Sequence, residues 1–103
     1  MIKIKRPPTH PGKILKEDFL ISMGISQTEL ADRLGITFRT VNEILNEKRG
    51  ISPEMAVRLA CFFGTSEELW LNLQDQYDLH KVKEKKGEVL RKITPYRKLR
   101  KTA

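Results

Sequence analysis

A short run of polar and aromatic side chains near residue 40 has the chemistry to recognise the edges of DNA bases. The guanidinium of Arg39 can donate two hydrogen bonds to O6 and N7 of guanine, and the ring of Phe38 can lie against a thymine methyl group. Thr40 and Asn42 can hydrogen-bond a phosphate or a base edge. The alternative is that this run forms only the solvated face of a helix. The candidate reading residues are Thr37, Phe38, Arg39, Thr40, Asn42 and Glu43.

Candidates for phosphate contact flank this run on both sides. Gln27 is expected at the start of the preceding helix, where the helix N-terminus attracts a phosphate, although it can equally be an ordinary first-turn polar residue. Asn46, Lys48 and Arg49 follow the run and are expected to face the DNA backbone on the same side. Contacts of this kind position a protein on the duplex without reading its sequence.

The residues around these candidates have the spacing of a helix-turn-helix. Counted from Gln27, the small Ala31 is the fifth position, where two steeply crossing helices approach closely, and Gly35 is the ninth. Gly35 stands where the chain leaves a helix in a left-handed conformation, which costs a residue with a Cβ about 1–2 kcal/mol. Val41 and Ile44 share one face of the second helix and point into the core. The opposite, polar face is available to a DNA groove.

Capping residues and glycines predict an all-α chain of five helices. Thr9 or His10 is expected to cap the first helix, and Pro11 lies in its first turn. Gly24 is expected to end this helix. The later helices begin at capping serines or threonines, and glycine closes two of them. The expected starts are Ser26 with Glu29, Thr37, Ser52 with Pro53, and Ser66 with Glu67 and Glu68; the second helix ends near Leu34 and the fourth at Gly64.

Apolar residues at helical spacing supply the expected core. Cys61 is expected to be buried among them rather than to act as a nucleophile. As the only cysteine it forms no internal disulfide and fits a reducing cytoplasm. The core residues are Ile14, Leu15, Phe19, Leu20, Val41, Ile44, Leu45, Met55, Ala56, Leu59, Ala60 and Phe63, with the stripe of Leu69, Trp70, Leu73 and Tyr77 in the last helix.

The positive charge of the chain is concentrated at its C-terminal end. Residues 1–80 contain 10 basic and 11 acidic side chains, whereas residues 81–103 contain 10 basic and 2 acidic ones. We therefore expect an arm at 1–9, a near-neutral helix-turn-helix domain at 10–80, and a basic, partly helical or mobile tail at 81–103. The tail either adds a non-specific attraction to phosphates or orders against an acidic partner surface.

Other function classes lack the residues that they need. His10 and His80 are 70 positions apart and only one cysteine is present, so no metal site is expected. No glycine-rich phosphate loop, nucleophile–histidine set or acidic pair is present, so neither a cofactor nor an enzyme is expected. No apolar run approaches the roughly 20 residues that span a bilayer, and the first residues lack a secretion signal. We therefore expect a cytoplasmic protein that binds no membrane.

Motifs on both sides of the helix-turn-helix resemble the HigA-type antitoxins, within the XRE/Cro-like helix-turn-helix proteins. The resemblance covers roughly residues 10–79, and its most specific parts are the His-Pro-Gly start and the Trp-Leu-Asn-Leu-Gln end. It implies a five-helix, lambda-repressor-like domain. The matching segments are 10–12, 24–27, 30–31, 46–53, 58–60, 64–74 and 77–79.

The resemblance also implies partners. The family forms dimers, binds an inverted repeat in double-stranded operator DNA at its own promoter, and neutralises a HigB-like toxin, a small ribonuclease that cleaves mRNA on the ribosome. DNA contact is implied at Gln27 and at the reading residues, and the homodimer contact at Leu69, Trp70, Leu73 and Tyr77. Many relatives have glycine where this chain has Glu47, so a slightly strained or differently shaped helix end is expected there.

Two alternatives to the antitoxin remain open from the sequence. One is a free-standing transcriptional repressor without a toxin partner. The other is mainly a protein-interaction module, which the near-neutral charge of residues 1–80 favours.

Overall fold

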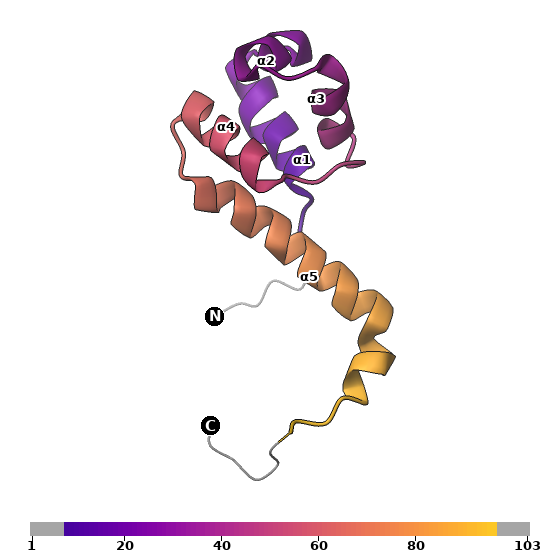
Figure 1. Cartoon of the computed structure of the whole chain (residues 1–103). Coiled ribbons are helices and arrows are strands. Elements are labelled where there is room, and N and C mark those ends of the chain that lie inside the picture. The colour runs from indigo at the N-terminus through magenta and orange to yellow at the C-terminus, as the bar shows by residue number, and fades with distance from the viewer. Residues whose placement is uncertain (1–7, 97–103) are drawn as a thin grey trace.

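The computed structural model describes residues 8–96, and this part of the chain folds into helices without any strand (Figure 1). The all-α prediction is confirmed. The first helix is continuous from Pro11 to Ile21, and its second part, Leu15–Ile21, is π-helical. Residues 1–7, most of the predicted arm, and residues 97–103 lie outside the described residues. The elements are α1 (Pro11–Ile14), η1 (Leu15–Ile21), α2 (Gln27–Leu34), α3 (Phe38–Leu45), α4 (Pro53–Phe63) and α5 (Glu67–Arg91).

Local capping explains where the helices begin and end. Each hydroxyl cap accepts a hydrogen bond from the backbone N–H three residues further on, which satisfies a donor that the first helical turn leaves unpaired. Gly35 and Gly64 follow α2 and α4 with φ of 72° and 74°, a conformation that glycine adopts at least cost. The hydroxyl caps are Ser26, Thr37, Ser52 and Ser66, as predicted.

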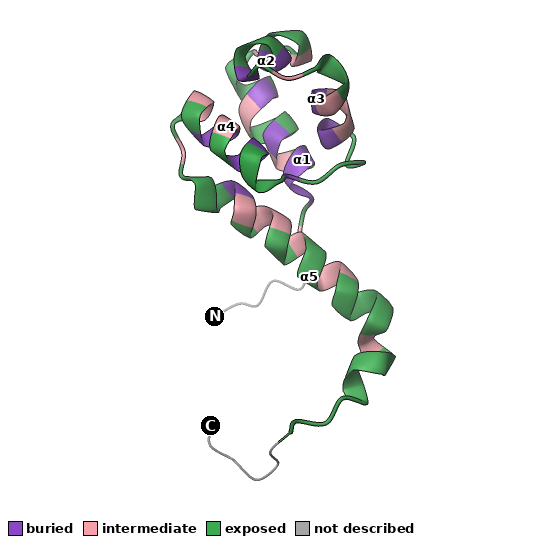
Figure 2. Cartoon of the chain, viewed as in Figure 1, coloured by how far each residue is buried: buried purple, intermediate pink, exposed green. Residues whose placement is uncertain are grey.

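The core lies where α1, η1, α2, α3 and α4 meet the first turns of α5. Trp70 at its centre is fully buried, and its ring packs against Phe19 of η1 with the ring centroids 5.0 Å apart. Its indole N–H donates to Thr65 Oγ1 at 2.8 Å, so the one polar atom of the ring is satisfied. Figure 2 shows the buried segments facing inward on the bundle and on the start of α5.

The start of α1 packs unusually close to the end of α3. A Cβ on Gly12 would overlap the carbonyl oxygen of Ile44, so the two backbones touch with no room for a side chain. The ring of the buried His10 accepts a hydrogen bond from Gly12 N at Nδ1 over 2.8 Å, which caps α1. The same ring meets Tyr77 of α5 edge-on. The capping role expected of Thr9 or His10 therefore belongs to His10.

The helix α5 continues well past the globular part of the protein. It runs to Arg91, with a kink at Lys86, and its far end projects away from the bundle in Figure 1. Apolar side chains there are exposed, as are most of the basic ones, and Figure 2 shows this end as almost wholly exposed. No described helix is long and apolar enough to cross a membrane.

The predicted burial of Cys61 is wrong. The inward stripe of α4 consists of Met55, Ala56, Leu59 and Ala60, and residue 61 falls outside that stripe because each residue turns the helix by about 100°. The Cys61 side chain is therefore exposed.

Candidate nucleic-acid interface

The two helices of the helix-turn-helix are tied together by side chains as well as by their apolar contacts. Asn42 Nδ2 donates to Gln27 Oε1 at 3.0 Å, which links the third helix to the first turn of α2. On the opposite side, Arg58 of α4 donates from Nη1 to the carbonyl oxygen of Leu34 at 2.6 Å, at the end of α2. The first turn of α2 is thus bonded to α3, and the last turn of α2 is bonded to α4.

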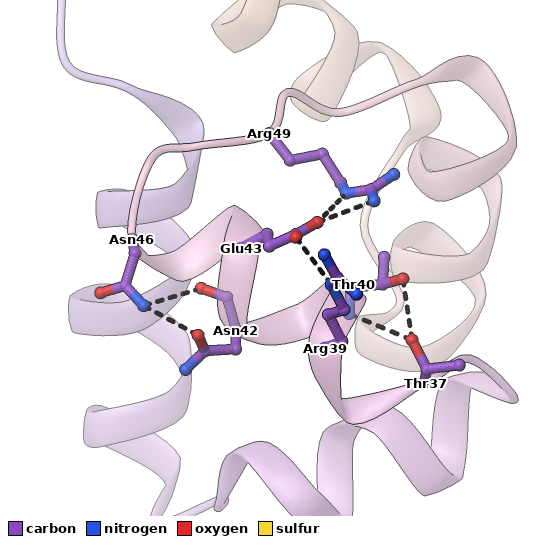
Figure 3. A network of polar contacts seen from close by, with 7 residues as sticks. All are labelled: Thr37, Arg39, Thr40, Asn42, Glu43, Asn46 and Arg49. Carbon is purple, nitrogen blue, oxygen red and sulfur yellow. Dashed lines mark hydrogen bonds and ion pairs between the residues drawn. The ribbon is translucent and has the colours of Figure 1, made fainter.

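A carboxylate at the centre of the exposed face of α3 binds two arginines (Figure 3). Glu43 Oε2 accepts from Arg39 Nε at 3.1 Å, and Glu43 Oε1 accepts from Arg49 Nε at 2.9 Å and Nη2 at 2.7 Å. The bonds from Arg49 and then from Arg39 hold the pKa of Glu43 below its ordinary value. The carboxylate is therefore ionised at neutral pH, and the cluster carries one net positive charge.

The remaining reading candidates surround this cluster on the same helix. Thr37 Oγ1 accepts from Thr40 N at 3.1 Å and lies 2.9 Å from Thr40 Oγ1, so Thr37 is both the cap of α3 and an exposed hydroxyl. Phe38 is half exposed, at 50%, so part of its surface is accessible to a base. The structure thus brings the reading candidates together on α3 and its capping residue, Thr37.

The candidates after α3 are also exposed, in a tight turn. Asn46 Nδ2 donates to the carbonyl oxygen and to Oδ1 of Asn42, at 3.0 and 3.1 Å. Glu47 has a φ of 60°, the left-handed conformation expected where relatives have glycine. This turn brings Arg49 back over α3 to meet Glu43, whereas Lys48 is bonded to α3 only through its backbone N–H.

Two supporting residues were missing from the sequence-based site. Arg58 holds the end of α2, as described above, and Gln74 of α5 accepts a hydrogen bond from Ile51 N at 2.7 Å, which fixes the segment following Arg49. Both belong to segments that carry the family resemblance, 58–60 and 64–74, so those motifs were the available signal.

The four residues predicted at the dimer interface differ in their exposure within the protomer. Trp70 is fully buried within the protomer, so its side chain presents no surface to a second copy. Leu73 is partly buried against the core, and Tyr77 contacts His10 through its ring. Leu69 is 37% exposed and remains the most accessible of the four.

The described residues contain no cluster of three or more histidine, cysteine or acidic side chains that could hold a metal ion. The polar groups of the interface are donors and acceptors suited to bases and phosphates.

Known proteins resemble the chain over most of its length. Residues 15–70 match the helix-turn-helix family. Virulence-associated protein I of Dichelobacter nodosus is 40% identical over 87 residues, covering 84% of this chain and 81% of that protein. Antitoxin HigA-1 of Vibrio cholerae is 35% identical over 95 residues, covering 92% and 90%. The structure of Pseudomonas aeruginosa antitoxin HigA with the higBA promoter has a TM-score of 0.82 at 43% identity, covering 85% of this chain and 97% of that one. The chain belongs to the HigA-type antitoxin family of helix-turn-helix proteins.

Proposed function

We propose that this protein is a DNA-binding antitoxin that represses its own toxin–antitoxin operon as a homodimer and neutralises a HigB-like toxin. The proposal rests on the exposed polar face of α3. It is supported by the similarity of the chain to the structure of Pseudomonas aeruginosa antitoxin HigA with the higBA promoter. An α-helix fits the major groove, and the residues at its N-terminal end meet the base edges.

The proposed contacts divide into two kinds. Arg39 and Phe38, in the first turn of α3, are proposed to read bases, and Thr40 and Asn42 of the same helix are proposed to contact a base or a phosphate. Gln27, Asn46, Lys48 and Arg49 are proposed to contact phosphates, together with the N-terminus of α2. These assignments rest on exposure, on the shared helical face and on the chemistry of each side chain.

The experiment is a gel-shift titration on the intergenic DNA upstream of the gene, with and without the product of the adjacent reading frame. A retarded complex on this DNA, not formed on a scrambled duplex, supports the repressor, and co-purification with the neighbouring product supports the antitoxin. Operator binding without co-purification favours a free-standing repressor. Co-purification without operator binding favours an interaction module.

A further inference from the structure

The way in which Glu43 holds Arg39 leaves one particular end of the guanidinium available. Glu43 Oε2 accepts only from Nε, the nitrogen next to the side-chain stem. Within the described part of the chain, the two Nη groups of Arg39 meet no protein acceptor, and the side chain is 85% exposed. Two parallel bonds to guanine O6 and N7 are donated by just such a pair of outward-facing N–H groups.

Arg49 is held in the opposite manner. Its Nε and Nη2 both donate to Glu43 Oε1, so these two nitrogens already have an acceptor. The Arg49 side chain is 50% exposed. Glu43 itself is 26% exposed, and its carboxylate lies between the two arginines (Figure 3). A carboxylate so occupied by cations has little remaining capacity to accept a hydrogen bond from a base, and it repels phosphates.

We infer that Glu43 is a specificity-determining positioning residue, which aligns Arg39 end-on toward guanine and lowers the attraction of α3 for DNA of any sequence. The inference rests on the proposed DNA-binding function and changes the role of Glu43 from a direct contact to an indirect one. An exposed arginine has about 2 kcal/mol of rotamer entropy to lose, and the bond to Glu43 fixes part of that freedom before DNA arrives.

The test compares Glu43→Gln with the native protein on the intergenic duplex and on a scrambled duplex of the same composition. Glutamine keeps the size of the side chain but removes the charge that holds both arginines. Operator affinity should fall about tenfold, because a misaligned Arg39 loses part of its bidentate discrimination. Affinity for scrambled DNA should rise, with the log–log salt slope steeper by up to about one unit, because one more positive charge meets phosphate.

Glu54→Gln is the matched control. Glu54 accepts from Nε and Nη2 of Arg58 at 3.1 and 2.8 Å, four residues apart on α4 as Arg39 and Glu43 are on α3. Arg58 keeps its bond to Leu34 through Nη1, a different nitrogen. This variant loses the same charge away from α3 and should leave the ratio of operator to scrambled affinity unchanged.

A double-mutant cycle separates positioning from a general structural effect. In an Arg39→Ala background, Glu43→Gln should no longer weaken operator binding, because no reading arginine remains to be aligned. Equal losses on both duplexes, or an unchanged operator affinity in Glu43→Gln, would overturn the inference while leaving the proposed function intact. A native protein that does not prefer its intergenic DNA would overturn the proposed function itself.

Discussion

Substituting single side chains on α3 can distinguish contacts that read DNA bases from contacts that only bind phosphates. Arg39→Ala should weaken operator binding roughly 5- to 150-fold, the equivalent of about 1–3 kcal/mol for one bidentate base contact. The affinity for random DNA should fall far less, because the variant loses at most one ionic contact with a phosphate. Fluorescence anisotropy with labelled duplexes measures both affinities. Equal losses on the two duplexes would contradict a base-reading role for Arg39.

His10 makes stability depend on pH. Burial lowers its pKa from the ordinary value of 6.5, against the opposing charges of Glu47 and Asp78, and its Nδ1 must be deprotonated to accept from Gly12 N. The folded state therefore binds protons less readily than the unfolded chain. The stability that His10 contributes is complete above pH 6.5 and is lost as the pH falls through the lowered pKa.

The corresponding variant is His10→Asn, because asparagine also caps a helix but does not titrate. Between about pH 7.5 and about pH 5.5, the thermal midpoint of the native protein should fall more than that of the variant. Differential scanning calorimetry or circular dichroism measures the two midpoints. Parallel declines in the two proteins would show that the ring's protonation has no part in stability.

At the scale of helices, the sequence was sufficient wherever the decisive interaction is local. The hydroxyl of Ser26 or Ser52 accepts a hydrogen bond from an N–H three residues away. Gly35 and Gly64 adopt the left-handed conformation that ends a helix, which other residues adopt only at a cost. The fold class followed from these signals together with the apolar spacing and the resemblance.

The remaining features depend on geometry that no local pattern encodes. Arg49 meets Glu43 only because the turn at Glu47 folds the chain back over α3. The exposure of Cys61 depends on which face of α4 is covered. The sequence did not predict the full length of α5, because the apolar residues after Tyr77 are scattered among charges, which weakens the helical spacing. The helix nevertheless continues to Arg91, because lysine, glutamate and leucine are good helix formers.

The basic tail, residues 81–103, is the subject of a separate prediction. Deleting residues 81–103 removes 10 basic and 2 acidic side chains. If the tail attracts phosphates, its deletion should make the log–log salt slope of DNA binding shallower on operator and scrambled duplexes alike, because fewer counterions are released. A titration series in salt measures the slope. An unchanged slope with lost toxin binding would instead indicate that the tail contacts an acidic partner surface.

For the whole molecule, the proposed dimer fixes the geometry of the operator. Two copies of α3 related by a two-fold axis reach successive turns of one face of the duplex, about 34–36 Å or 10 base pairs apart. Inserting about five base pairs between the half-sites turns one of them to the far side, so binding should fall to the level of a single half-site. The same insertion outside the repeat is the control, and a gel shift distinguishes the two.

The exposed thiol of Cys61 gives this protein a point of attachment for a probe. The chain has one cysteine, it lies on α4, and the reading face lies on α3 (Figure 1). A maleimide dye would therefore mark each protomer once, at a known position, without any engineered mutation. Energy transfer between two such dyes would report the separation of paired protomers in solution, and so the distance between their reading helices before and after DNA or toxin is added.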